Sequence, residues 1–119
     1  MKNSLPFLFL LSVLIGCSKD QPKYPFVIQV ETEDGIRLPN VFIEATADVP
    51  NALPQFSGIT GEDGTISFEY NFEAVLKVRA TRGTNPPSWM GCNFVKLEAD
   101  NTVTVKVTLQ PYDPTQPGC

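Results

Sequence analysis

The sequence predicts an all-β fold, namely a seven-stranded antiparallel sandwich of two sheets. Apolar and polar residues alternate with period two in seven short segments, and turn-forming residues separate these segments at intervals of about ten residues. No stretch after Cys17 has a convincing helical period. Because each such strand has one apolar face to bury, two sheets must pack face to face.

The first 16 residues have the order of charge, apolar run and small residue that is typical of a secretory signal. Lys2 precedes an apolar run over residues 5–15, and a glycine stands directly before Cys17. A membrane-spanning helix or a core helix is the alternative. The run, however, has only 11 residues and includes Pro6, whereas a spanning helix needs about 20 apolar residues. We therefore expect an exported protein.

The end of this segment, Leu14-Ile15-Gly16-Cys17, resembles the lipobox of bacterial lipoproteins. The resemblance implies that residues 1–16 are removed as a signal peptide, that Cys17 receives a diacylglycerol and that its new amino group is acylated. It also implies a protein held in the outer membrane by the lipid on Cys17, with residues 17–25 as a polar tether. Ser18-Lys19-Asp20 partly resembles the export signal of Bacteroidota-type surface lipoproteins, which favours display on the cell surface.

Residues 26–110 form the predicted sandwich domain, with strands at 26–31, 41–46, 57–60, 65–70, 76–81, 92–97 and 102–109. In the first strand Phe26, Ile28 and Val30 share one face, and the second strand alternates in the same way. The short third strand ends at Gly61-Glu62-Asp63-Gly64. The Asp-Gly pair supplies the positive φ angles that a hairpin turn into the fourth strand needs.

The last three strands repeat this alternation, and the run 102–109 is the most regular of them. We expect the sixth and seventh strands to pair as a hairpin across the loop 98–101, with Leu97 opposite Thr102. Residues 111–119 form a proline-rich tail without a strand of its own.

Four segments of this domain resemble the prealbumin-like, carboxypeptidase-regulatory-like group of Ig-type sandwiches. The segments are VIQVETEDGIRLPNVFIEAT, GITGEDGTISFEY, AVLKVRAT and VTVKVTLQ. The resemblance covers nearly all of residues 26–110 and implies an Ig-like fold that serves as a structural or binding module. It implies no catalytic residue, because the matching positions are core and turn residues. The chain departs from the group at RGTNPPSWMGC, a long loop with two prolines.

Two of the three cysteines remain once Cys17 is lipidated, namely Cys92 and Cys119. In an exported protein such a pair predicts a disulfide, and two free thiols are the alternative. In the expected hairpin Cys92 lies opposite Val107, close to where the tail leaves the last strand, so the tail can return Cys119 to it.

Composition narrows the function. The net charge is −4 and no basic run occurs, which argues against a nucleic-acid partner. The chain has no histidine, so it lacks the base of a Ser-His-Asp triad and the partner of a catalytic thiol. Glu33-Asp34 and Glu62-Asp63 fit turns better than calcium loops. We expect no enzyme, cofactor or metal.

Trp89 is the candidate ligand-binding residue, in a loop that two prolines stiffen. An exposed tryptophan can stack on a sugar ring or anchor a protein partner. The alternative is an aromatic side chain folded back over the sandwich edge. We expect a non-enzymatic structural or binding module of the cell envelope whose partner is a protein or a glycan. In the alternative function, the Trp89 loop makes it a glycan-binding or adhesion module.

Overall fold

The computed structural model describes residues 21–47, 54–83 and 87–115. These residues form strands only: β1 (Tyr24–Glu31), β2 (Phe42–Ala47), β3 (Gln55–Ile59), β4 (Thr65–Tyr70), β5 (Val75–Arg82), β6 (Trp89–Lys96), β7 (Val103–Thr108) and β8 (Gln110–Pro111). No helix in the described ranges is long and apolar enough to cross a membrane. The predicted all-β fold is confirmed.

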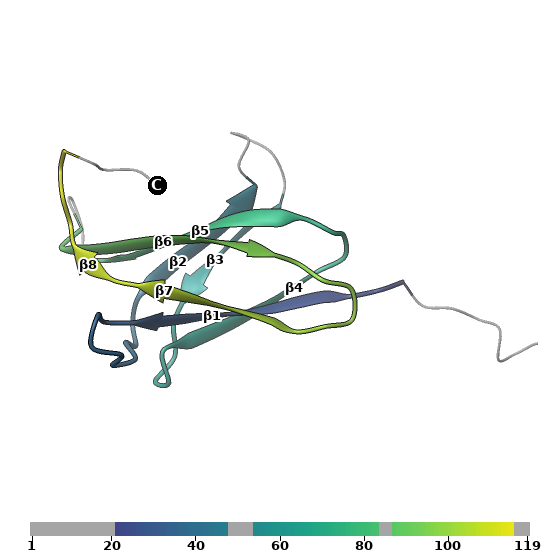
Figure 1. Cartoon of the computed structure of the whole chain (residues 1–119), viewed down its shortest axis with the longest axis horizontal. Helices are drawn as coiled ribbons and strands as arrows, with labels where there is room; N and C mark the ends of the chain where they lie inside the picture. The colour runs from purple at the N-terminus through teal and green to yellow at the C-terminus, as the bar shows by residue number, and fades with distance from the viewer. Residues whose placement is uncertain (1–20, 48–53, 84–86, 116–119) are drawn as a thin grey trace, which may run out of the picture.

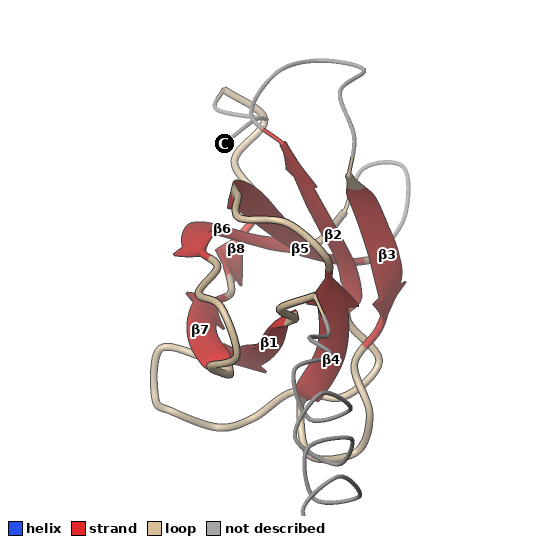
Figure 2. Cartoon of the chain, turned by 90° about the vertical axis from the view of Figure 1, so that its right-hand side faces the viewer, coloured by secondary structure: helices blue, strands red, loops and turns tan. Residues whose placement is uncertain are grey.

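The strands form two sheets that pack as a sandwich (Figures 1 and 2). One sheet has the order β4-β1-β7, and the other has the order β3-β2-β5-β6-β8. The predicted count of seven strands is wrong, because the described residues contain eight. The additional strand is β8, which pairs with the start of β6 and lies where the sequence predicts the beginning of a tail.

The predicted antiparallel arrangement is wrong for one pair of strands. β1 and β7 run parallel, with Phe26 opposite Val103 and Val30 opposite Val107. They are the first strand and the last long strand of the domain, so no hairpin joins them. An antiparallel direction is therefore not imposed on this pair by a short connection.

The predicted hairpin of the sixth and seventh strands is also wrong. β6 pairs with β5 and β8, whereas β7 pairs with β1 in the other sheet. The short turn between them, closed by an isolated bridge from Glu98 to Asn101, carries the chain across the sandwich. Period-two alternation determines which face a strand buries but not which strand lies beside it.

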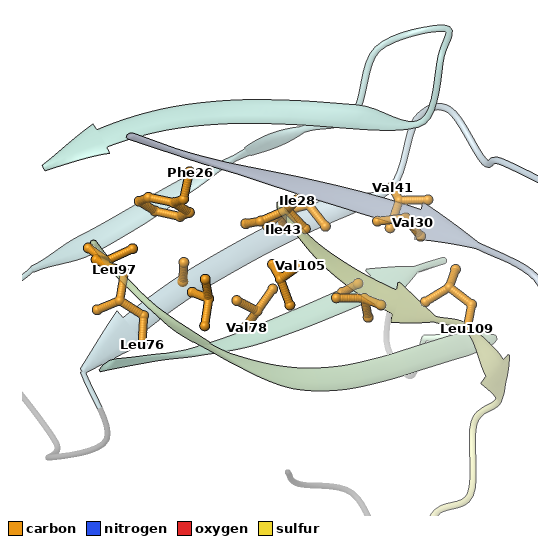
Figure 3. Packing of buried hydrophobic residues seen from close by; sticks show 14 residues of the cluster. Phe26, Ile28, Val30, Val41, Ile43, Leu76, Val78, Leu97, Val105 and Leu109 are labelled. Atoms are coloured by element: carbon orange, nitrogen blue, oxygen red, sulfur yellow. The ribbon is translucent and has the colours of Figure 1, made fainter. Parts of the chain in front are cut away.

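The core lies between the sheets and consists of the inward side chains of both (Figure 3). Among the described residues it comprises Phe26, Ile28, Val30, Val41, Ile43, Ala45, Leu76, Val78, Ala80, Val95, Leu97, Val105, Val107 and Leu109. The buried hydroxyl of Thr60 donates to the Leu38 carbonyl at 2.9 Å and accepts from the Val41 amide at 3.0 Å. Most of the core residues are the apolar members of the predicted alternating runs, so the sequence pattern identifies them correctly.

Strand direction defines two ends of the sandwich. At the proximal end β1 begins, with Tyr24 opposite Tyr70, and β5 begins beside the last residue of β6. At the distal end β1 and β7 finish, and Arg82 of β5 lies opposite Trp89 of β6. In Figure 1 β1 begins toward the right, and β8, which pairs with Trp89, lies at the left.

Candidate ligand-binding site at the distal end

Trp89 begins strand β6 and does not lie in a loop, which corrects the sequence-based placement. It pairs with Arg82 on one side and with Pro111 on the other. The Tyr112 amide also donates to the Ser88 carbonyl at 2.9 Å. The chain after β7 thus supplies a neighbour that extends β6 toward its N-terminus. Local sequence could not indicate this neighbour, because the pairing joins residues more than 20 positions apart.

The Trp89 side chain belongs to the inward-facing series of β6. Val95 of this series is buried against the core, and Asn93 donates from Nδ2 to the Lys106 carbonyl of β7 at 2.7 Å. Trp89 is four residues from Asn93, so it falls on the same face at the end of the strand. Its side chain lies at the open distal end of the sandwich and is 44% exposed. It is therefore neither a core residue nor a free loop side chain.

Three hollows meet at Trp89. A cavity of about 140 Å³ is lined by Thr32, Leu38, Arg82, Trp89 and Leu109. A hollow of about 330 Å³ adds Glu33, Asp34 and Pro111 to Thr32, Trp89 and Leu109. A third, of about 380 Å³, is lined by Arg82, Gly83, Ser88 and Trp89. The indole is the wall common to all three, so a ligand in any of them would contact it.

The charged side chains around the indole form no hydrogen bond or ion pair with other described residues. Arg82, Glu33 and Asp34 are exposed, and neither the guanidinium nor either carboxylate forms a hydrogen bond or ion pair in the described structure. Leu109 is buried beneath them. The site therefore offers an apolar base, an aromatic face, a donor fork and acceptor oxygens, which together suit an uncharged or amphipathic ligand with a ring.

Gly83 and Ser88 fix the Arg82 side of the site. Gly83 has φ +94°, and a Cβ at this position would meet the Ser88 nitrogen at 2.8 Å. The Ser88 amide donates to the Arg82 carbonyl at 2.8 Å. Because an L side chain is strained at that φ and has no room, glycine is needed for this approach. The bond from Ser88 keeps Ser88 and Trp89 beside Arg82.

The sequence interpretation singled out Trp89 but missed Arg82, Thr32 and Leu38. One signal for Arg82 was available, because it continues the inward series Leu76, Val78 and Ala80 of β5 as its only charged member. A charged residue on an otherwise apolar face marks the place where that face reaches solvent. Thr32 and Leu38 join the site only through the sandwich geometry.

The other predicted site residues lie elsewhere. Cys92 is on the outward-facing series of β6, opposite Arg79. Cys119, the predicted partner, and Cys17, the predicted lipidation residue, both lie outside the described residues. The pairing of Cys92 with Cys119 and the lipidation of Cys17 remain predictions.

Two carboxyl groups have a pKa clearly below the ordinary value. The Thr65 hydroxyl donates to Asp63 Oδ1 at 2.9 Å and the Thr65 amide at 3.1 Å, and these bonds lower the pKa of Asp63. Asp113 has a lowered pKa for the same reason, through the hydroxyl and amide of Thr115. Both aspartates stabilise turns. Within the described ranges no group of three potential ligand residues could hold a metal ion.

The two packed sheets define the chain as a β-sandwich domain. No family model and no curated protein matches it. Among solved structures, it resembles the crystal structure of a DUF3823 family protein from Parabacteroides merdae, with a TM-score of 0.54 and 21% identity. The match covers 78% of this chain and 48% of that chain, so this chain spans about half the length of that protein. At this identity the likeness supports the fold alone.

Proposed function

We propose that this chain is a non-enzymatic lipoprotein of the cell envelope, anchored by lipid on Cys17, whose sandwich binds a partner at its distal end. The observation that carries the binding role is the half-exposed Trp89, which forms the common wall of three hollows. It lies beside Arg82, whose guanidinium forms no ion pair in the described structure. The anchoring rests on the resemblance of residues 14–17 to a lipobox.

The sandwich is proposed to be of the Ig-like type found in prealbumin-like, carboxypeptidase-regulatory-like domains. The Glu33-Asp34-Gly35 and Asp63-Gly64 turns within the matching segments support this, since Gly35 and Gly64 both have positive φ. The packing of two sheets face to face is compatible with that class. Domains of this group act as structural or binding modules, which is the role proposed here.

The absence of histidine from the chain supports a role without catalysis, because the common general base and its partners are not available. The net charge of −4 favours a protein or glycan over a nucleic acid. The site lies at the end of the sandwich opposite to the start of β1. A lipid attached before β1 would therefore leave the hollows facing away from the membrane.

Site-specific photo-crosslinking in intact cells tests the binding role. A benzophenone amino acid is placed at Trp89 or, as a matched control, at Phe42. Phe42 is 42% exposed and also lies near the distal end, but on the outer face of its sheet. We expect a discrete adduct to a protein or glycan from position 89 that is absent from position 42. Equal adducts from both positions, or none from position 89, would contradict the proposal.

The alternative function is a glycan-binding or adhesion module. The observation that favours it is the indole face beside the Arg82 fork and Thr32, because sugar rings stack on tryptophan while their hydroxyls bind polar side chains. Trp89 is the only tryptophan of the chain, so its fluorescence reports on this site alone. Titration with soluble oligosaccharides should shift the emission, and Arg82→Gln should weaken the response. An unchanged emission with every sugar argues for a protein partner.

A further inference from the structure

A column of aromatic rings runs from the core to the proximal end. Phe26 packs on Phe56 and Phe68, with ring centroids 5.5 and 5.6 Å apart. Phe56 contacts Tyr70 at 5.7 Å, and Tyr70 contacts Phe72 at 5.5 Å. The column begins at a fully buried ring and ends at Phe72, which is 61% exposed. The last ring is thus supported from below by its neighbours but leaves most of its own surface in water.

Phe72 is not the only apolar side chain exposed at this end. Val75, at the start of β5, is 54% exposed, and Phe94 of β6 is 53% exposed. Lys77 is opposite Phe94 and Val75 is opposite Lys96, so Val75 and Phe94 are diagonal neighbours on the outer face of the sheet. Three large exposed apolar side chains therefore lie toward this end, Phe72 after β4 and the other two on the outer face of the opposite sheet.

The chain is clamped at the point where it enters. The Lys23 amide donates to Asp100 Oδ1 at 3.2 Å, and the Asp100 amide donates to the Lys23 carbonyl at 2.6 Å. Asp100 is held in a left-handed conformation, with φ +55°, in the turn between β6 and β7. These two bonds tie the segment before β1 to the proximal end. The described chain therefore enters the sandwich at this end.

We propose that the proximal end rests on the lipid surface to which the chain is anchored, with Phe72 inserted most deeply. This inference depends on the proposed lipid at Cys17. Lys23 is only six positions after Cys17, so the clamp can lie no more than about 21 Å from the lipidated residue. Aromatic side chains favour the interface between headgroups and acyl chains. The short tether makes the bilayer the neighbour that these three side chains meet.

The charges at this end are nearly balanced. The lysines are Lys23, Lys77 and Lys96, and the acids are Glu69, Glu73, Glu98 and Asp100. Lys23 Nζ lies 4.0 Å from Glu69 Oε1, so part of this charge is paired. A contact driven by anionic lipid would require an excess of lysine or arginine. We therefore expect seating that depends on the apolar side chains and changes little with salt or with anionic lipid.

Depth-dependent quenching in vesicles tests the seating. The full lipidated chain is reconstituted in phosphatidylcholine vesicles whose acyl chains are brominated or not. The single tryptophan is moved to the proximal end in W89F/F72W. The matched control is W89F/I59W, because Ile59 is also 61% exposed but lies near the distal end. Circular dichroism checks that both variants keep the fold.

We expect brominated lipid to reduce the emission of W89F/F72W strongly and that of W89F/I59W or the native Trp89 little. Flotation with the vesicles reads the anchor separately. A chain that floats while its tryptophan at position 72 is not quenched overturns the seating and leaves the anchor intact. A chain that does not float overturns both. An emission of W89F/F72W that shifts with protein concentration instead of lipid would show contact between two copies and would also overturn the seating.

Discussion

At the residue scale, Gly91 shows how closely the two sheets approach each other. It lies in β6, and a Cβ at this position would meet the Thr108 carbonyl oxygen and approach Val107 Cγ1 to 2.9 Å, both in β7. The same contact region includes the bond from Asn93 to the Lys106 carbonyl. Gly91 and Asn93 are thus needed because β7 passes directly above them. The predicted sixth strand began at Cys92, so Gly91 was expected in the loop before it.

Gly91→Ala should destabilise the domain by about 1–3 kcal/mol, because the added methyl group meets backbone that cannot easily move. Denaturant unfolding measures the loss. Gly61→Ala is the control, since its Cβ would meet nothing nearer than 3.7 Å. Equal midpoints for Gly91→Ala and the unchanged protein would show that β6 and β7 are not this close.

The stability of the turn at Asp63 depends on pH. Its lowered pKa in the folded protein means that the ionised carboxylate is the form that Thr65 stabilises. This stabilisation is complete above the ordinary pKa of 3.8, and it is lost as the pH falls through the lower pKa of the folded state. Acid should therefore weaken the turn that leads from β3 in one sheet to β4 in the other.

In thermal unfolding between about pH 4 and pH 2, Asp63→Asn should show a smaller decrease of Tm than the unchanged protein, because one linked proton is removed. Glu62→Gln is the matched control. Its carboxylate forms no hydrogen bond or ion pair in the described structure, so the decrease should stay as steep as in the unchanged protein. Identical slopes for all three proteins would argue against the Thr65 bonds.

At the element scale, the sequence predicts strand positions well and strand neighbours poorly. Alternation placed β1, β2, β4, β5 and β7 within a few residues, because burial of one face imposes period two on each strand by itself. The turn at Asp63-Gly64 is present and Gly64 has positive φ, but the predicted hairpin is wrong, because β3 and β4 lie in different sheets.

The neighbours of each strand could not be predicted from alternation. The crossing from β6 to β7, the parallel neighbour of β1 and the short strand β8 all depend on segments distant in the chain. The candidate site followed the same rule. Trp89 could be selected from its type, whereas Thr32, Leu38 and Arg82 come together only because β1, β5 and β6 end at one place.

Strand β6 is also the element that the predicted disulfide would join to the C-terminal segment. A bond between Cys92 and Cys119 closes a loop that should stabilise the folded state by about 3–4 kcal/mol in the chain-entropy model. We expect peptide mapping of the non-reduced protein to find these two cysteines linked, and Cys119→Ser to lower the unfolding midpoint. Quantitative alkylation of both thiols in protein from the cell envelope would refute the bond.

At the scale of the whole molecule, the proposed membrane contact and the proposed binding site lie at opposite ends of the sandwich. The proximal end bears the clamp at Lys23 and the exposed Phe72, and the distal end bears Trp89 and its hollows. If a lipid at Cys17 holds the first end, the second is presented away from the membrane. The presentation of Trp89 away from the membrane and the seating of Phe72 then follow from one orientation. Both therefore depend on the same covalent modification.

Mass spectrometry of the amino-terminal peptide, taken from protein in the membrane fraction, tests this modification most directly. We expect a peptide that begins at Cys17, bears acyl chains and lacks residues 1–16. Cys17→Ser should retain those residues, incorporate no labelled palmitate and leave the membrane fraction. The proposed lipid anchor would be contradicted by an unmodified Cys17 preceded by residues 1–16, or by palmitate incorporated into Cys17→Ser.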